Sequence, residues 1–203
     1  MQDSDIRCYG SINVSEEPEL KEQVKDGSLF IWECPHCGTH NLLKTETLYH
    51  DPEKKLMVWL LPSERLDEVQ SAKLNAIADS LGDYTLRRVE DVGSLIEKVN
   101  IIDAGLDDVV LEMCKYVTRM ELCEKHSDKE EAIMDAPFKF YRMQGADNEI
   151  VLSFPLDGNM QGINIGFNVY EDCRGILQRN KAALDSIEGF ACIDSKWLAG
   201  FFR

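Results

Sequence analysis

The sequence predicts an α+β fold with a small strand unit, a helical pair and a C-terminal subdomain of strands and helices. Short apolar runs bounded by Gly, Pro and Asp occur before residue 62 and again after residue 137, as expected of strands. Between them, apolar residues recur with helical spacing over 92–102 and 109–120. With 203 residues, 44% of them hydrophobic, the chain can bury a core of its own.

The first elements form the strand unit. Pro18, the acidic residues after it and the stop at Asp26-Gly27 predict a short helix over 18–25. Apolar runs bounded by turn residues predict the strands, and a polar bend over 50–55 separates the last two. The strands are expected at 28–33, 42–48 and 56–61.

Helices dominate the middle of the chain. Ser63 is a plausible N-cap for a helix that ends at Gly82, and a strand is expected at 84–89. The two amphipathic segments that follow are joined at Ala104-Gly105, so we expect them to pack as a pair. Asp107-Asp108 lies where acidic residues complement the helix dipole.

The C-terminal part alternates again between strands and helices. The polar stretch 124–131 predicts either a linker or the solvated end of the preceding helix, and we place a boundary near 126–135. The segment 136–203 is therefore expected to be an α+β subdomain. Its elements are strands at 138–143, 149–154 and 162–169, a helix over 171–184, a short strand at 190–193 and a helix from Ser195.

Charge and composition exclude several classes of function. The net charge is −15 and acidic residues are spread over the chain, so neither nucleic acid nor an anionic membrane is an expected partner. The longest apolar run, 56–61, is far shorter than the roughly 20 residues of a membrane span. Because no secretory signal is recognisable, we expect a cytoplasmic protein whose seven cysteines are thiols or metal ligands.

The run Cys34-Pro35-His36-Cys37-Gly38 carries the clearest chemical signal. Two residues between the cysteines let a tight turn aim both sulfurs at one point, and the glycine lets the backbone curl around them, as in the knuckle of a zinc ribbon. A structural zinc ion needs four ligands, and a second knuckle is absent. Candidates for the remaining positions are Cys8 and His40, with His36 and His50 as weaker ones.

Other chemistry is less well supported. The same Cys-Pro-His-Cys run occurs in dithiol redox centres, but there it caps a helix, whereas the residues after Cys37 predict a strand. Cys114 and Cys123 lie on a helix and are expected to be buried small hydrophobes, and Cys173 and Cys192 are likewise expected to be structural residues and not reactive thiols. The sequence contains no phosphate-binding glycine loop and no nucleophile elbow, so we expect no catalytic residues.

Several runs in order resemble the CpXC family of bacterial and archaeal proteins. The resemblance covers about residues 11–120 and defines a CpXC-like domain over 1–125. The runs that carry it are 11–14, 18–21, 26–30, 34–38, 48–55, 57–62, 95–98 and 103–108. The resemblance implies a zinc site formed by two Cys-Pro-x-Cys knuckles, and only the second is present. Either the chain starts after the first knuckle or this member lacks it.

The resemblance implies no enzymatic activity, so we expect a non-enzymatic protein-interaction module. Its knuckle at Cys34 and Cys37 either holds zinc with ligands from elsewhere or, with the first knuckle missing, holds none. The expected partner is another protein or a second copy of the chain, which could complete the site by symmetry. The alternative is an enzyme that acts on a small molecule or a peptide through a cysteine thiol or an open metal position.

Overall fold

The computed structural model describes residues 6–62, 77–78 and 81–202 and confirms the α+β class. The chain divides into two compact units, the first formed by residues 1–99 and 189–192 and the second by residues 100–188 and 193–203. In the described ranges no helix is long and apolar enough to cross a membrane.

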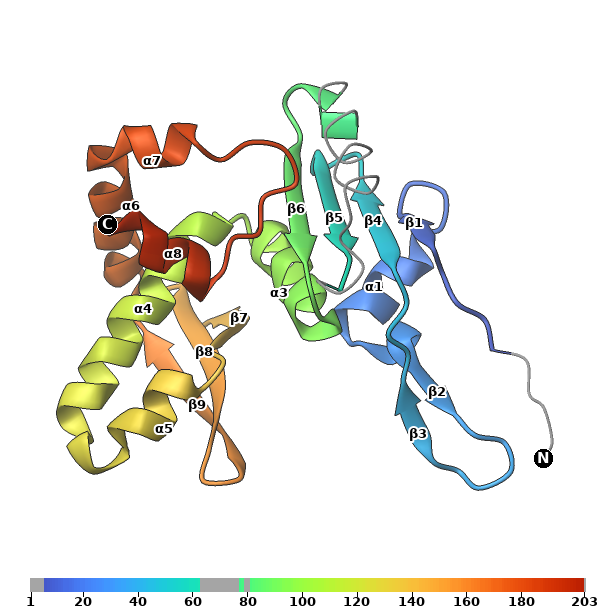
Figure 1. Ribbon diagram of the computed structural model, residues 1–203, viewed down its shortest axis with the longest axis horizontal. Coiled ribbons are helices and arrows are strands. Elements are labelled where there is room, and N and C mark those ends of the chain that lie inside the picture. Colours follow the sequence, from blue (N-terminus) through green and yellow to red (C-terminus); the bar gives the residue numbers. More distant parts are fainter. Residues whose placement is uncertain (1–5, 63–76, 79–80, 203) are drawn as a thin grey trace. The chain divides into compact units, whose positions relative to one another are not determined.

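A mixed sheet of four strands forms the centre of the first unit (Figure 1). The strand order is β1-β4-β5-β6, with β4 and β5 antiparallel and both outer pairs parallel. Ala191 forms an isolated parallel bridge with Arg87 on β6. The strand bounds are β1 Ser11–Asn13, β4 Thr47–Asp51, β5 Leu56–Leu60 and β6 Thr85–Val89.

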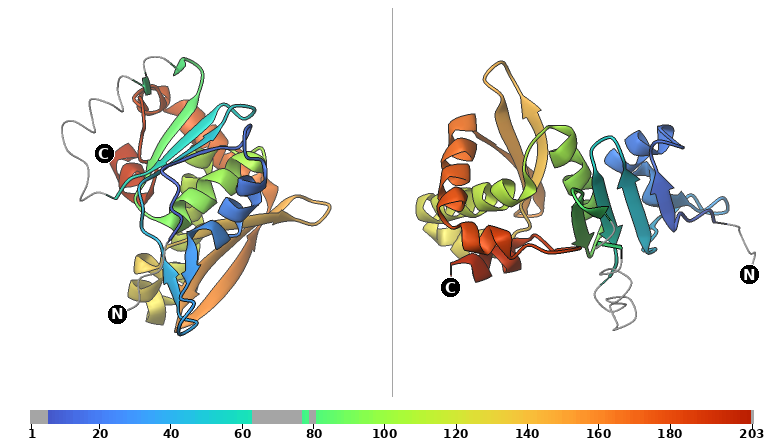
Figure 2. Two further views of the ribbon diagram at one scale, coloured as in Figure 1. Left: turned by 90° about the vertical axis from the view of Figure 1, so that its right-hand side faces the viewer. Right: turned by 90° about the horizontal axis from the view of Figure 1, so that it is seen from above.

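Both faces of this sheet are covered. Helices α1 (Glu19–Lys25) and α3 (Val92–Asp103) lie on one face (Figure 2), and a Cβ atom on Gly27 would lie 3.2 Å from Ile96 of α3. Trp59 on β5 and Phe190 meet edge-on, with ring centroids 5.7 Å apart, in an apolar cluster with Leu61 and Leu86. The central strand β5 therefore contributes buried side chains in both directions.

A second, two-stranded sheet leaves the first unit as a hairpin. It consists of β2 (Ile31–Glu33) and β3 (His40–Leu42), it follows a 3-10 turn at Ser28–Phe30, and the described strands form no ladder between it and the larger sheet. The predicted strand at 28–33 is correct only for its second half, and the prediction of one strand over 42–48 is wrong. The chain leaves the hairpin after Leu42 and begins β4 only at Thr47, whose hydroxyl donates a hydrogen bond to the Tyr9 carbonyl (2.7 Å).

The other elements predicted for this unit agree better with the structure. α1, β5, β6 and α3 begin and end within one or two residues of their predicted bounds. The helix expected from Ser63 to Gly82 lies mostly outside the described residues; within it, residues 77, 78 and 81 are helical.

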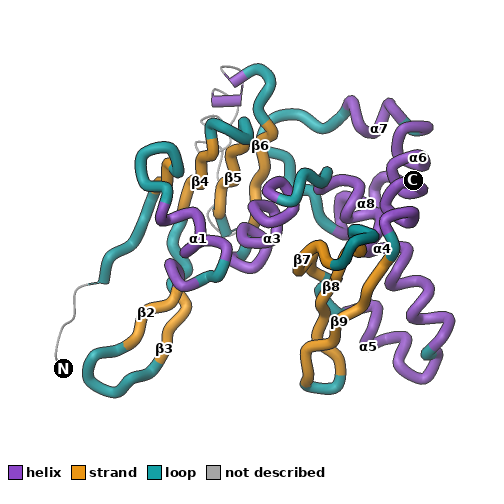
Figure 3. Tube along the Cα trace, turned by 180° about the vertical axis from the view of Figure 1, so that it is seen from behind, coloured by secondary structure: helices purple, strands orange, loops and turns teal. Residues whose placement is uncertain are grey.

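Three antiparallel strands and several helices form the second unit. The strands β7 (Lys139–Gln144), β8 (Glu149–Leu156) and β9 (Asn159–Ile165) pair in chain order, and β8 places Ile150, Leu152 and Phe154 in the core. Figure 3 shows these strands beside the helices of the unit. The helices are α4 Asp108–Lys125, α5 Glu130–Asp135, α6 Phe167–Arg179, α7 Lys181–Asp185 and α8 Ser195–Phe201, and α4 packs against α5, α6 and α8.

Helix α4 has polar contacts at both ends. Asp107 caps it, its carboxylate accepting hydrogen bonds from the Val109 and Val110 amides, while the Asp107 amide donates to the Tyr170 hydroxyl on α6 (2.7 Å). Near its other end, the Arg119 guanidinium donates to the Ala136 carbonyl (3.0 Å). The first two turns of α4 are buried on every side, including the ion pair of Glu112 and Lys115.

The predictions for this half need three corrections. The polar stretch 124–131 is not an extended linker, since α4 runs to Lys125 and is followed by a 3-10 turn at Ser127–Lys129 and then α5. The strand expected over 162–169 ends at Ile165, because α6 already begins at Phe167. The strand expected at 190–193 is only the single bridge at Ala191. The two compact units divide inside α3, between residues 99 and 100, and the domain boundary expected near 126–135 stays a prediction.

Candidate functional site

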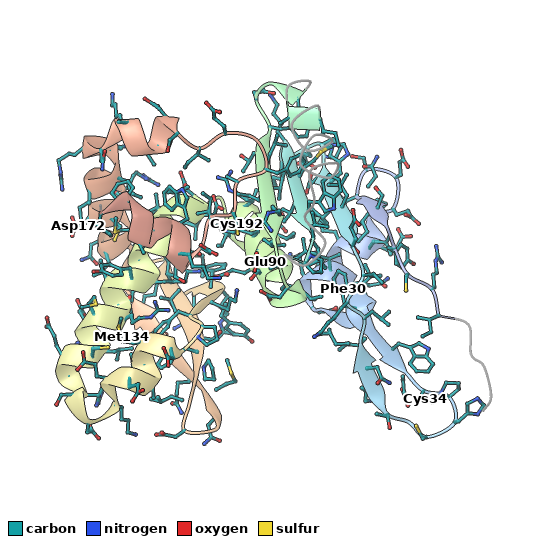
Figure 4. All side chains as sticks on the ribbon, in the orientation of Figure 1. Phe30, Cys34, Glu90, Met134, Asp172 and Cys192 are labelled. Atoms are coloured by element: carbon teal, nitrogen blue, oxygen red, sulfur yellow. The ribbon has the colours of Figure 1, made fainter. Side chains whose placement is uncertain are left out.

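The candidate site lies at the tip of the β2–β3 hairpin. Ile31 pairs with Leu42, Trp32 with Asn41 and Glu33 with His40, so the strands lead directly into the turn that contains both cysteines. Phe30 lies buried at the base of the hairpin, and Cys34 lies near the opposite end (Figure 4). The hairpin thus carries the cysteines away from the core of the first unit.

Backbone hydrogen bonds close the turn. The Cys34 amide donates to the Thr39 carbonyl (2.9 Å), and the Gly38 amide donates to the Cys34 carbonyl (2.8 Å). Gly38 has φ +67°, in the left-handed region that residues with a Cβ atom rarely adopt. The sequence Cys-x-x-Cys-Gly therefore folds back on itself within five residues, as the motif predicted.

The two thiols differ in their surroundings. Cys37 is exposed and Cys34 is half-buried. The Cys37 Sγ lies 3.2 Å from the Thr39 hydroxyl oxygen. Hydrogen bonds from the side chain and backbone of Thr39, and then from the Cys34 side chain, lower the pKa of the Cys37 thiol. Since a thiolate is the form that binds a metal, this turn favours metal binding at Cys37.

The other predicted ligands are spread over the first unit. Cys8 precedes Tyr9 and Gly10, whose carbonyls accept hydrogen bonds from Thr47 and Leu48 at the start of β4. His40 is exposed on β3, and His36 is exposed in the turn between the cysteines.

His50 lies on β4 and has a partner there. Its Nε2 is 3.3 Å from the Tyr84 hydroxyl, and the two ring centroids are 5.7 Å apart. His50 is thus engaged on the larger sheet and not on the hairpin that carries the cysteines.

The hairpin offers two cysteine thiols as possible ligands for a metal ion. Two thiols separated by two residues on one tight turn fit half of a tetrahedral zinc site. Among residues 6–62, 77–78 and 81–202, no group of three or more His, Cys, Asp or Glu side chains is placed to hold a metal ion. The two thiols are therefore ligands of the type that zinc prefers, on a turn of the right form. They are two of the four ligands that a structural zinc site needs.

The remaining cysteines do not contribute to this site. Cys114 and Cys173 are buried on α4 and α6. Their mutual hydrogen bond, followed by burial, raises the pKa of Cys114, so this thiol stays neutral. Cys123 is also buried, which confirms the prediction that Cys114 and Cys123 are small core residues.

Sequence reasoning missed two features of the hairpin. One is Thr39, whose hydroxyl lies against Cys37; its position two residues after the cysteine was the available signal. The other is the pair of exposed apolar side chains, Ile31 and Leu42, which are 50% and 55% accessible and directly opposite each other. Only the strand register brings them together.

The fold and site define an α+β protein with a two-cysteine hairpin. The family model described as CpXC protein matches residues 1–115, which is more than half of the 203-residue chain. The chain therefore belongs to the CpXC family, as the motifs predicted. The match ends inside α4, in the second unit. No curated protein and no solved structure matches the chain.

Proposed function

We propose that this chain is a non-enzymatic protein-interaction module in which Cys34 and Cys37 are ligands of a structural zinc ion. The observation that supports this most directly is the closed turn that presents both thiols together at the end of a hairpin. Zinc bound there would hold the hairpin in shape, because an isolated two-stranded hairpin is marginally stable in water. The seven free thiols suit a reducing cytoplasm.

The contacts of the thiols favour a structural role over catalysis. Cysteine nucleophiles are activated by a histidine or another base within hydrogen-bond reach. The groups that contact the Cys37 thiol include the Cys34 side chain and the Thr39 hydroxyl, and the hydroxyl cannot take up a proton at neutral pH. The hydrogen bond therefore stabilises a thiolate but supplies no base for turnover.

The surface of the hairpin supports an interaction role. Ile31 and Leu42 form an apolar pair on one face, and Glu33 and His40 continue that face toward the knuckle. Exposed apolar side chains beside polar ones are common at sites of protein association. We call these four residues the hairpin face.

Zinc content and stability together test the proposed role of the cysteines. Protein purified without chelator should contain zinc, and a chelator should lower its thermal stability. Cys34→Ser and Cys37→Ser should each abolish zinc retention, whereas Cys192→Ser, which removes a half-buried thiol elsewhere in the first unit, should not. Two results together would count against a structural metal: the purified protein contains no zinc, and all three variants are as stable as the unmodified protein.

The interaction role needs its own experiment. Immobilised protein should capture a partner reproducibly, and the variant Ile31→Lys/Leu42→Lys should lose it. A matched control is Tyr141→Lys, which changes an exposed aromatic residue in the second unit (58% accessible). Equal capture by both variants would show that the hairpin face is not the contact surface.

A further inference from the structure

We propose that a second copy of this chain completes the zinc site, so that one zinc ion is bound by Cys34 and Cys37 of two chains. This inference rests on the proposed function, because it requires that the knuckle bind zinc. It goes further by naming the partner and the source of the missing ligands.

The described part of one chain provides too few ligands at the hairpin tip for a structural zinc ion. Structural zinc sites take four ligands, nearly always cysteine and histidine. All seven cysteines and all four histidines of the sequence lie in the part of the chain that the structure describes. In that part, no third His, Cys, Asp or Glu side chain joins Cys34 and Cys37 in a group that could hold a metal ion. The part of the chain that the structure describes therefore offers two of the four ligands at the hairpin tip.

Symmetry supplies the other two ligands without a new type of residue. A twofold axis through the metal places the same two thiols on the opposite side, which yields a four-thiolate set. The cysteines lie at the tip of a projecting hairpin, and Cys37 is exposed there, so a second hairpin can approach. A half-site at a surface is suited to this arrangement, whereas a half-site in a cleft would be closed to a second chain.

The hairpin face provides the apolar contact that a second copy needs. Ile31 and Leu42 lie on the same side of the hairpin as Glu33 and His40, because side chains two residues apart on a strand share a face. They are 50% and 55% accessible. In a twofold dimer each surface meets its own copy, so both apolar pairs are buried in one contact.

Charge opposes the association of two copies, and zinc and the apolar contact would offset it. Each chain carries a net charge of −15, so two copies repel each other. Salt screens that repulsion between exposed charges. Association through zinc and apolar contacts should therefore be stronger at about 0.15 M salt than at about 0.01 M, the opposite of what an interface held by surface ion pairs would show.

Metal stoichiometry and mass, measured on the full chain, test the inference. Apo-protein prepared with chelator is titrated with zinc while light scattering records its mass. We expect a monomer of 23.1 kDa that doubles in mass as zinc is added, with the transition complete at one zinc per two chains. Cobalt in place of zinc should give the absorption of a tetrahedral four-thiolate site, with the same break in the titration.

Variants identify the groups involved. Cys34→Ser leaves one thiol per chain at the tip, so zinc-dependent dimerisation should be lost. Cys8→Ser should leave both stoichiometry and mass unchanged, and a change would overturn the inference by making Cys8 a ligand. Ile31→Glu/Leu42→Glu should weaken the zinc-dependent dimer by about tenfold or more, since like charges then meet across the twofold axis. Tyr141→Glu in the second unit should not.

The outcomes separate this inference from the proposed function. Half an equivalent of zinc in a zinc-dependent dimer supports both. One zinc per monomer, or a dimer that persists in chelator, overturns the shared site and leaves the zinc knuckle standing. Protein that retains no zinc at any concentration of chain overturns both.

Discussion

The ammonium group of Lys21 on α1 lies 2.9 Å from a carboxylate oxygen of Asp51, a residue at the end of β4 that is only 2% accessible. The other oxygen of Asp51 accepts a hydrogen bond from the Lys54 amide in the turn that leads to β5 (3.1 Å). One buried carboxylate therefore joins a helix, a strand and a turn of the first unit.

Asp51→Asn should consequently destabilise the protein by about 2 kcal/mol, because it removes a charge-assisted hydrogen bond. Urea unfolding with an unchanged m-value would measure this. The control is Glu22→Gln, which removes an exposed partner of Lys25 and should cost less than about 0.5 kcal/mol. Equal effects would mean that the buried position of Asp51 confers no advantage.

The lowered pKa of Cys37 should be visible in its reactivity. In zinc-free protein, alkylation of Cys37 should reach half its maximal rate below the pH expected of an ordinary cysteine, because more thiolate is present at a given pH. Thr39→Val removes the hydroxyl that contributes most and should move the midpoint to higher pH. Site-resolved mass spectrometry across pH measures both, and an unmoved midpoint in the variant would refute this cause.

Zinc affinity should depend on Gly38. An alanine there would have space, since the nearest atom to its Cβ is a Glu33 carboxylate oxygen at 3.8 Å, but it would be strained at φ +67°. That strain amounts to about 1–2 kcal/mol. We therefore expect Gly38→Ala to weaken zinc binding by about tenfold in competition with a chelator. Gly10→Ala, at a glycine with open space around it and no positive φ, is the matched control and should leave the affinity unchanged.

The ion pair of Glu112 and Lys115 offers a test in the second unit. Both side chains are buried on α4, so Lys115→Met should cost about 3 kcal/mol, the scale for breaking a buried pair. Adding Glu112→Gln should cost less than the sum of the single changes, because the two groups interact. A double-mutant cycle in urea measures the coupling, and strict additivity would show that the pair is not coupled.

The sequence predicts the elements of this protein better than their contacts. The apolar run at 56–61 and the helical spacing at 92–102 and 109–120 predicted β5, α3 and α4, because burial determines such patterns. The strand expected at 42–48 was wrong because the knuckle turn sets the register of β3, and the chain then needs several residues to reach β4. Such positions depend on tertiary pairing.

For the site as well, local patterns predicted some features, whereas others depend on tertiary pairing. The spacing of Cys34 and Cys37 predicted a tight turn with both sulfurs together, and the hydrogen bonds of Cys34 and Gly38 have that form. The pairing of Ile31 with Leu42 follows only from the register of the hairpin. The contact of Lys21 with Asp51 joins residues 30 positions apart, beyond the range of any local pattern.

The separate two-stranded sheet of the hairpin has a consequence for how this protein would respond to zinc starvation. Since β2 and β3 form no ladder with the larger sheet in the described residues, loss of the proposed zinc ion would fray the tip while the rest of the first unit stays folded. A zinc-free chain would then be folded but unable to bind a partner through its tip. Restored zinc would re-form the tip without a new round of synthesis or folding.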